Sequence, residues 1–419
     1  MPDRELPDGW RVVRLGDVAD VRRDPFDPRN GTSLPYVALE HIEQGFARLR
    51  GWAKSGSSVS TKTRFQTGDV LFGKLRPHLR KGVRAPFDGV CSTDILALFP
   101  KEGLRAEYLG QLVHWRPVEE YAIRTSIGTK MPRTTWPALA RYRLPLPPLG
   151  EQARIAEVLD GIDAAVEKTE GVIAATERLR SALLGELLTR GVPGWHTEWK
   201  DVPGIGTMPA CWEVVRLGEV AEVQTGRQVG KPPGNGKTVT MPYLSVANVK
   251  DGYLHLDTVK TMEIGQAEIT RFSLRAGDVL FTEGGDADKL GRGCLWNAEM
   301  DPCLHQNHVF AVRPRPAQLL PAFLAGYARS PRGKRYFLGC AKQTTNLASI
   351  NSTQLKAMPL PLPPVGEQVA IQSALDLVER RRQFEVEQLE TLRTAKQACA
   401  SALLSGRVRV RQALEIPND

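Results

Sequence analysis

A short basic segment carries the side chains best suited to contact an anion. Between Gly73 and Gly82 the chain holds Lys74, Arg76, His78, Arg80 and Lys81. The two glycines and Pro77 indicate a loop, because both residue types favour turns. Lysine and arginine in a loop can neutralise phosphates, and an arginine can bridge the O6 and N7 atoms of guanine. The segment is therefore a candidate nucleic-acid contact, and a solvated surface loop without a role is the alternative.

A second polar segment runs from residue 124 to residue 133. Its candidate contact residues are Thr125, Ser126, Thr129, Lys130 and Arg133. Short hydroxyl side chains and cations suit contacts to phosphates and base edges. Ordinary turn chemistry is the alternative for this segment.

Four segments of the chain recur in the same order. Trp10–Val21 returns as Trp212–Val223, Thr63–Phe65 as Thr270–Phe272, Gly68–Phe72 as Gly277–Phe281, and Leu144–Gln152 as Leu360–Gln368. The offset grows from 202 to 216 residues through small insertions. A period near 210 residues is far longer than the 20 to 50 residues of solenoid repeats. The pattern indicates a duplicated domain, each copy with a globular part, a proline-rich junction and a helical part.

The second copy carries different chemistry at the matching loop. After Gly277–Phe281 the charged residues are Glu283, Asp286, Asp288, Lys289 and Arg292. Carboxylates repel phosphate but can accept a hydrogen bond from cytosine N4. Two related loops of opposite charge should not bind the same nucleotide sequence.

Two further segments of the second copy are polar. One holds Gln306 and Asn307, whose amides can pair with adenine, and the other holds Lys342, Gln343, Thr344, Thr345 and Asn346. For the latter segment, too, ordinary turn chemistry is the alternative.

The globular parts read as an α/β fold rich in strands. The expected strands are Val12–Leu15, Tyr36–Leu39, Asp69–Phe72 and Ile95–Phe99, and the expected helices are Ala106–Trp115 and Leu320–Tyr327. The junction Leu-Pro-Leu-Pro-Pro should be extended, because proline removes a donor and restricts the residue before it.

Each junction is followed by about 40 residues without proline, which predicts two long helices. The first helix should pack through a stripe with alternating steps of four and three that includes Val158, Ile162, Val172, Leu179 and Leu183. The second should pack through Leu375, Val378, Leu389 and Leu392, with an interruption at Arg380–Arg382. We expect the helices to pair as an antiparallel coiled coil that gives the chain pseudo-twofold symmetry. The alternative is that each helix lies only on its own domain.

These patterns predict four regions along the 419 residues. They are a globular domain at 1–148, a helical spacer at 149–190, a linker and second domain at 191–364, and a second helical spacer with a tail at 365–419. The formal net charge of +9 divides unevenly, because residues 1–150 carry +8 and residues 191–365 carry +4, whereas residues 151–190 carry −3 and residues 366–419 are neutral. The globular parts are therefore expected to face an anion.

Several function classes lack support in the sequence. There is no signal peptide, no apolar stretch long enough to span a membrane, and no paired cysteine spacing typical of a zinc site. We expect reduced thiols, a cytoplasmic protein and no metal. Glycine-rich nucleotide-binding motifs and the common hydrolase motifs are absent, so no catalytic residue is assigned.

The duplicated units, the two Leu-Pro-Leu-Pro-Pro-x-Gly-Glu-Gln junctions and the long helices together resemble the specificity subunit of type I restriction–modification enzymes. The resemblance covers essentially the whole chain and includes Gly68–Pro77, Glu283–Gly293, His305–His308 and Lys342–Asn346. It implies that each globular unit is a target recognition domain for one half of a split, asymmetric site in double-stranded DNA. It also implies a non-catalytic subunit whose helices set the gap between half-sites.

The same resemblance implies the partners and cofactors. Two modification subunits would dock on the coiled coil and methylate adenine with S-adenosylmethionine, and restriction subunits of the complex would cleave DNA with ATP and Mg²⁺. This chain itself would hold no cofactor. A scaffold that recruits partners without reading DNA is the alternative function.

Overall fold

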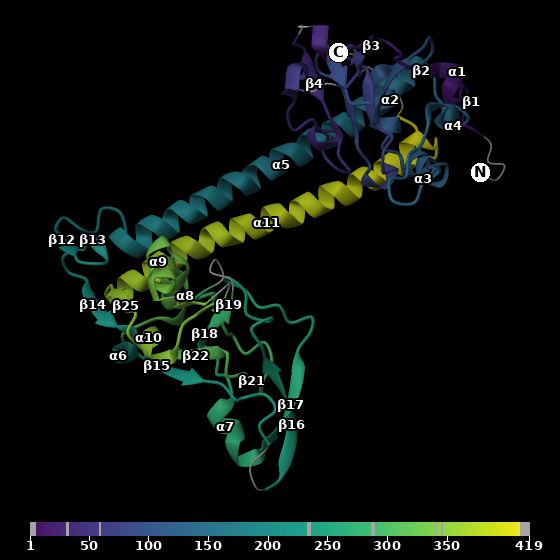
Figure 1. Cartoon of the computed structure of the whole chain (residues 1–419). Helices are drawn as coiled ribbons and strands as arrows, with labels where there is room; N and C mark the ends of the chain where they lie inside the picture. Colours follow the sequence, from purple (N-terminus) through teal and green to yellow (C-terminus); the bar gives the residue numbers. More distant parts are fainter. Residues whose placement is uncertain are drawn as a thin grey trace, which may run out of the picture. The chain divides into compact units, whose positions relative to one another are not determined.

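The computed structural model describes residues 6–30, 33–57, 60–232, 236–285, 290–340, 342–344 and 347–410. The chain divides into two compact units, one of residues 1–172 with 385–419 and the other of residues 173–384. Each unit combines one globular part with half of α5 (Leu149–Arg190) and half of α11 (Val365–Leu404) (Figure 1). Within the described ranges, no helix has both the length and the apolar character needed to cross a membrane.

The globular part of the first unit contains two sheets. The first is antiparallel with the order β2 (Ala19–Val21), β10 (Ile95–Pro100), β7 (Val70–Gly73) and β8 (Gly82–Arg84). The second has the order β3 (Pro25–Phe26), β6 (Lys62–Phe65), β9 (Gly89–Cys91), β4 (Pro35–Val37) and β5 (Ala53–Lys54). The apolar runs that form β7 and β10 are almost wholly buried, as central strands require.

Four short helices complete this globular part. They are α1 (Leu15–Val18), α2 (Ala106–Leu112), α3 (Arg116–Arg124) and α4 (Trp136–Leu139). The expected strands over Asp69–Phe72 and Ile95–Phe99 are confirmed, whereas the strand that begins near Tyr36 ends at Val37. Helix α3 escaped prediction because Pro117 reads as a break, although proline is well tolerated in the first turn of a helix.

The second unit repeats this plan. Its first sheet has the order β15 (Ala221–Thr225), β22 (Val309–Pro314), β18 (Val279–Thr282) and β20 (Gly293–Leu295). Its second sheet has the order β17 (Lys260–Gly265), β16 (Thr238–Leu244) and β21 (Leu304–His305), and a separate hairpin joins β12 (Trp199–Val202) to β13 (Gly206–Pro209). Its helices are α6 (Leu217–Val220), α7 (Ile269–Phe272), α8 (Pro321–Arg329), α9 (Pro331–Cys340) and α10 (Ser352–Lys356).

The proline-rich junctions are strands with partners. In the first unit β1 (Arg11–Arg14) pairs antiparallel with β11 (Arg143–Leu146), and in the second β14 (Glu213–Arg216) pairs with β25 (Pro359–Leu362). The tryptophan that opens each repeat is buried next to this pair. Its indole N–H donates to the glutamate of the Gly-Glu-Gln motif, from Trp10 to Glu151 at 3.0 Å and from Trp212 to Glu367 at 2.8 Å.

The glutamine of the same motif is a second anchor. Gln152 accepts from the backbone N–H of Arg105 at 2.9 Å and donates to the carbonyl oxygens of Gly103 and Pro147, both at 2.9 Å. Gln368 makes the matching three bonds in the second unit, to Leu320, Gln318 and Pro363. The motif therefore attaches the first turn of each long helix to the globular part of its own unit.

Within each unit the two long helices run antiparallel. In the first unit Asp163 on α5 pairs with Lys396 on α11, and in the second Glu379 on α11 pairs with Arg180 on α5 at 3.9 Å. The acids in these two pairs are 216 positions apart, and so are the cations, so the same contact occurs twice. The fold class expected from the sequence, with duplicated mixed units and antiparallel helices, is confirmed inside each unit.

The packing stripe of α11 is continuous. Buried or half-buried side chains follow steps of four and three at Ile371, Leu375, Val378, Arg382, Glu385, Leu389, Leu392, Lys396, Cys399 and Leu403. The interruption expected at Arg380–Arg382 is wrong, because Arg382 occupies a stripe position and pairs with Glu379 at 2.6 Å. Long charged side chains can cover apolar surface with their stems while their heads remain paired.

The expected stripe of α5 is wrong at two positions. Val158 is 39% exposed and Leu179 is 51% exposed, whereas Ile162, Val172 and Leu183 are half-buried. The most buried apolar positions are instead Ile155, Ala156, Leu159, Val166, Leu184, Leu187 and Leu188. Ile155 and Leu159 pack into the core of the globular part, so this end of α5 is buried by two surfaces at once.

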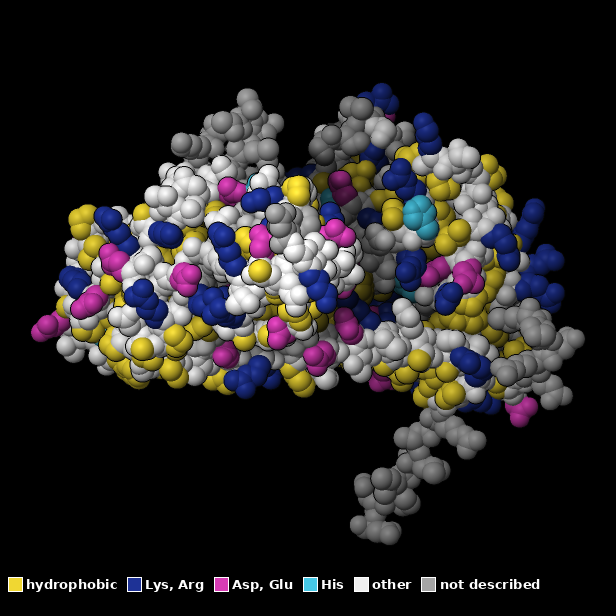
Figure 2. Space-filling model, turned by 90° about the horizontal axis from the view of Figure 1, so that it is seen from below, with side chains coloured by type: hydrophobic (Ala, Val, Ile, Leu, Met, Phe, Trp, Pro, Cys, Tyr) yellow, Lys and Arg dark blue, Asp and Glu magenta, His cyan; other side chains and the backbone are white. Residues whose placement is uncertain are grey.

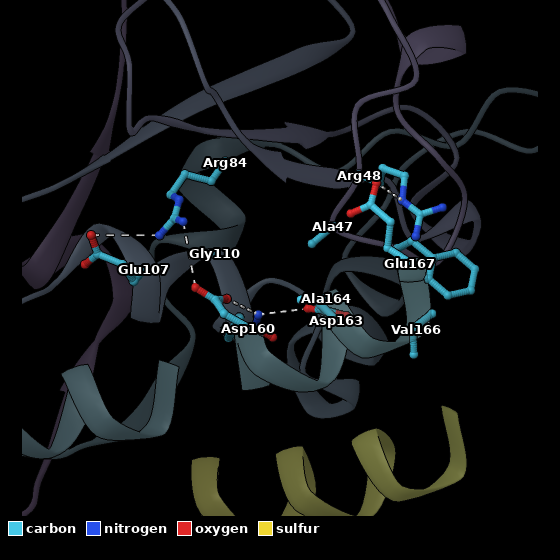
Figure 3. A pocket seen from close by; sticks show the side chains of 12 residues that line it. Ala47, Arg48, Arg84, Glu107, Gly110, Asp160, Asp163, Ala164, Val166 and Glu167 are labelled. Carbon is cyan, nitrogen blue, oxygen red and sulfur yellow. Dashed lines mark hydrogen bonds and ion pairs between the residues drawn. The ribbon is translucent and has the colours of Figure 1, made fainter. Parts of the chain in front are cut away.

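A polar pocket lies where the first globular part meets α5. Figure 3 shows Arg84 pointing between Glu107 and Asp160, with ion-pair distances of 3.8 and 3.7 Å. Gln111 on α2 donates to Asp160 at 2.6 Å and to Asp163 at 3.0 Å. These paired side chains hold the globular part against the helix around a cavity of about 270 Å³.

Candidate nucleic-acid interface

The two loops predicted as contacts in the first unit lie side by side. Leu75 forms a β-bridge with Arg133, and the backbone N–H of Arg76 donates to the carbonyl of Pro132 at 2.7 Å. The N–H of Thr134 donates to the carbonyl of Lys74 at 3.0 Å. Segments more than 50 residues apart in the sequence therefore form one surface at the end of β7.

The basic loop turns through a short 3₁₀ helix, Pro77–Leu79, that is flanked by two arginines in the left-handed conformation. Arg76 has φ 50° and Arg80 has φ 49°. This conformation is unfavourable for residues with a Cβ atom, and such strain is concentrated at functional positions. The side chains of Arg76, His78 and Arg80 are exposed, as contact with an external anion requires.

Some of the predicted contact residues in the first unit already have structural partners. The hydroxyls of Thr125 and Ser126 donate to the carbonyls of Tyr121 and Ile123 and so close the end of α3. The Nζ of Lys81 donates to the carbonyl of Leu39 at 2.6 Å. The remaining predicted residues are on the surface: Thr129 and Lys130 are exposed, Arg133 is exposed and pairs with Asp94, and Lys74 is half-buried.

The second unit brings its two predicted loops together in the same way. Strand β19 (Gly284–Gly285) pairs with β24 (Leu347–Ser349), which pairs with β23 (Lys342–Thr344). Of the predicted contacts, Lys342, Gln343 and Thr344 form β23, whereas Asp286, Asp288, Lys289, Thr345 and Asn346 lie outside the described residues. Arg292 is half-buried, and its carbonyl accepts from the N–H of Thr282 at the end of β18.

The segment Leu304–His308 reaches the same place. The N–H of Glu283 donates to the carbonyl of His308 at 2.9 Å, and His308 Nδ1 lies 2.5 Å from Glu283 Oε2. Asn307 Nδ2 lies 3.2 Å from His308 Nε2, and Gln306 is half-buried beside them. His308 therefore belongs to the site together with its neighbours Gln306 and Asn307, which the sequence predicted.

His305 has a structural role instead. Its ring is fully buried, Nδ1 donates to the carbonyl of Val309 at 2.7 Å, and burial lowers its pKa. Burial also raises the pKa of the Cys294 and Cys303 thiols to about 12, so both stay protonated. In the part of the chain that the structure describes, no group of three or more such side chains is placed to hold a metal ion.

Positive charge does not gather into one patch on the face drawn in Figure 2. On the face shown in Figure 2, Lys and Arg side chains are spread among uncharged atoms, with Asp and Glu between them. The candidate interface is instead identified by the paired loops that both units build at the end of the equivalent strands β7 and β18.

The family model described as the type I restriction modification DNA specificity domain matches residues 7–178 and again residues 209–394. The chain belongs to the family of type I restriction–modification specificity subunits. Among curated relatives, the MjaVIII specificity subunit of Methanocaldococcus jannaschii is 23% identical over 423 residues, which cover 97% of this chain and 94% of that subunit. Over 239 residues, 54% of this chain and 48% of the relative, the EcoKI specificity subunit of Escherichia coli K12 is 28% identical.

Solved structures share the fold. One, described as the structural basis underlying complex assembly and conformational transition of the type I R-M system, aligns with a TM-score of 0.63 at 23% identity and covers 97% of this chain and all of that one. The HsdS subunit from Thermoanaerobacter tengcongensis aligns with a TM-score of 0.52 at 23% identity over 97% and 99% of the two chains. As a specificity subunit, this chain is a DNA sequence-recognition component of a restriction–modification complex and is not itself catalytic.

Proposed function

We propose that this specificity subunit reads a bipartite, asymmetric DNA site, with one globular unit for each half. The observation that carries the proposal is the pair of loop sites built on one duplicated frame. In the first unit the loop after β7 is basic, and in the second the loop after β18 begins with Glu283. Loops that follow equivalent strands but carry opposite charge are suited to different base pairs.

The partners follow from this role. We propose that the long helices position two adenine methyltransferase subunits, and that restriction subunits join through the complex. Those partners would use S-adenosylmethionine and, for cleavage, ATP and Mg²⁺, in the cytoplasm. The specificity subunit would contribute DNA binding and orientation only.

Selection of bound sequences from random DNA tests the proposal. The specificity subunit would be assembled with its modification subunits, and two separated, different motifs are expected. Replacing residues 211–365 with the corresponding unit of another family member should change one motif and leave the other. A single contiguous motif, or a change in both halves after the exchange, would contradict the proposal.

Salt dependence distinguishes DNA reading from a scaffold role. Each lost phosphate contact lowers the slope of log affinity against log salt by about 1. Arg76→Ala should therefore reduce the slope by about that amount, whereas Arg23→Ala, whose side chain is 76% exposed elsewhere in the first unit, should not. Binding that is insensitive to both substitutions and to salt would favour the scaffold.

A further inference from the structure

The loop sites of the two units are held by matching backbone hydrogen bonds, and these bonds define equivalent positions in the two units. The N–H of Lys74 donates to the carbonyl of Asp94 at 3.0 Å, and the N–H of Glu283 donates to the carbonyl of His308 at 2.9 Å. Lys74 and Glu283 are each the first residue beyond the Gly73 or Thr282 end of the central strand. Position 74 therefore corresponds to 283, and position 94 to 308.

A third position completes the frame. The N–H of Thr134 donates to the carbonyl of Lys74 at 3.0 Å, and the N–H of Ile350 donates to the carbonyl of Glu283 at 2.8 Å. The residues just before these donors, Arg133 and Ser349, each pair with the residue that follows position 74 or 283. Position 133 therefore corresponds to 349.

The side chains at these positions form a different pair in each unit. In the first unit Asp94 Oδ1 accepts from Arg133 Nε at 3.1 Å, and the arginine side chain stays 44% exposed. In the second unit the His308 ring pairs with Glu283, whose side chain stays 32% exposed. In each unit the residue just before β10 or β22 supplies one partner, and that partner holds a charged side chain of the paired loops.

The first pair leaves donors available on the exposed Arg133 side chain. Asp94 accepts from Nε, and Nη1 has a long contact of 3.5 Å to the carbonyl of Met131, so Nη2 and the second hydrogen of Nη1 can still donate. Paired donors match the O6 and N7 atoms of guanine. The second pair presents only acceptors. Asn307 Nδ2 can donate to His308 Nε2, which fixes the ring so that Nδ1–H donates to Glu283. A carboxylate held in this way accepts from the amino group of a base.

We propose that Asp94 and His308 are equivalent positioning residues that set the base preference of the two half-sites. Asp94 orients Arg133 toward guanine in one half-site, and His308 orients Glu283 toward a base amino group, of cytosine or adenine, in the other. The inference rests on the proposed reading of one half-site by each unit, and it adds the chemical class of base that each unit reads.

Position-specific binding of the assembled complex tests the first unit. In DNA libraries that vary one base pair at a time, Asp94→Asn should reduce the preference for guanine at one position of one half-site by about tenfold, or about 1.4 kcal/mol, because the bidentate contact of Arg133 is no longer held in place. Arg133→Lys should give the same loss, since lysine lacks the fork. Asp94→Glu should restore part of the preference. Asp24→Asn, which removes an exposed carboxylate of the same unit, is the matched control.

The second unit gives an independent test. Glu283→Gln and His308→Phe should each weaken the preference for cytosine or adenine at one position of the other half-site, and the base that loses preference identifies which amino group is read. Glu198→Gln, at an exposed position of the same unit, should leave every preference unchanged.

The outcomes distinguish a failure of bipartite DNA reading from a failure of the positioning role of Asp94 and His308. If the wild-type complex selects no bipartite motif, the proposed function fails. If the complex selects a bipartite motif, the variants Asp94→Asn, Arg133→Lys, Glu283→Gln and His308→Phe decide the positioning role. That role fails if these variants weaken base preference equally at all positions or alter both half-sites. It also fails if they alter neither half-site while their thermal unfolding matches the wild type. Loss of folding in Asp94→Asn would leave Arg133→Lys to decide, because that change keeps the charge.

Discussion

The basic loop of the first unit keeps two arginines in a conformation that glycine adopts without cost. Arg76 and Arg80 flank a single turn, and Arg80 also lies 3.9 Å from Glu119 on α3. Burial raises the pKa of Glu119 to about 7. The loop thus combines backbone strain with a contact to a buried carboxyl group on α3, and neither is expected of a loop selected for stability alone.

Glycine at position 80 should separate stability from binding. Arg80→Gly and Arg80→Ala both remove the charge and the contact to Glu119, but only glycine relieves the left-handed backbone. The glycine variant should therefore be about 1 kcal/mol more stable than the alanine variant, while both bind DNA with similarly reduced affinity. Urea unfolding and titration with the selected DNA measure the two effects, and equal stabilities would show that the turn is not strained.

His114 makes the first unit sensitive to acid. Its Nε2 donates to the carbonyl of Gly82 at 2.9 Å, and burial lowers its pKa from about 6.5 to about 4. Below pH 6.5 the His114 ring is protonated in the unfolded chain but stays neutral in the folded unit until the pH approaches 4. The stability from the neutral ring is therefore fully present above pH 6.5 and is lost progressively toward pH 4, by up to about 3 kcal/mol.

The variant His114→Gln should lack this dependence. The difference in unfolding free energy between the wild type and the variant should therefore be smaller at pH 4.5 than at pH 7. Glu119 titrates with the opposite sign, because its raised pKa stabilises the fold below pH 4.5 and that contribution is lost as the pH rises to 7. It is present in both proteins, so it cancels in the comparison. A constant difference between the proteins across this range would contradict the assignment to His114.

At the scale of elements, the recurring motifs are visible in the sequence, but their structural role is not. The sequence shows that Trp10 and Glu151 recur as Trp212 and Glu367, but their distance along the chain hides that they bond to each other. Repetition predicts that a residue matters, whereas only the fold shows whether it binds a ligand or holds two elements together.

Helix periodicity gave the correct partners and only part of the correct face. A 4–3 spacing can be drawn through several overlapping stripes of one helix, and Val158 and Leu179 belong to a stripe that the structure exposes. The choice failed because α5 is also buried by its globular part, which no repeat of apolar residues encodes. Polar stripe positions such as Arg382 were missed because the spacing of apolar residues does not mark them, although Arg382 pairs with Glu379 on the same helix.

A pair of neighbouring leucines tests the stripe of α11. Leu375 is 8% exposed and packs in the core of the second unit, whereas Leu377 is 64% exposed. Leu375→Ala should lower the free energy of unfolding by about 2–4 kcal/mol, and Leu377→Ala should change it by less than about 0.5 kcal/mol. Chemical denaturation of the two variants checks this, and similar losses would place the stripe elsewhere.

At the scale of the whole molecule, the duplication was the most reliable prediction from sequence. Four ordered matches predict the unit length, and the first sheet has the same strand order in both units, whereas the second sheet has five strands in the first unit and three in the second. The pairing of loops separated by about 50 residues was not predictable, because it depends on backbone bonds such as that between Arg76 and Pro132. Local sequence identifies candidate loops, and only long-range topology joins them into a site.

The first unit combines residues 1–172 with residues 385–419, and this division of the chain can be tested. Leu404 is fully buried in the core that contains Trp10, whereas nearby Val408 is 53% exposed. Leu404→Ala should destabilise the first unit by about 2–5 kcal/mol, and Val408→Ala should have little effect. Hydrogen exchange should rise in residues 6–172 and stay unchanged in residues 173–384. Faster exchange in the second unit alone would contradict this division.

Leu403 and Leu404 also determine the order in which the protein can be completed as it is made. The second unit is continuous in the chain, so all of its residues have been synthesised by position 384. The first unit begins earlier but waits for the last helix to supply two of its core leucines. During translation, the unit that leaves the ribosome first is therefore the unit that is completed last, and the core surface that binds these leucines stays exposed until residues 403 and 404 have emerged.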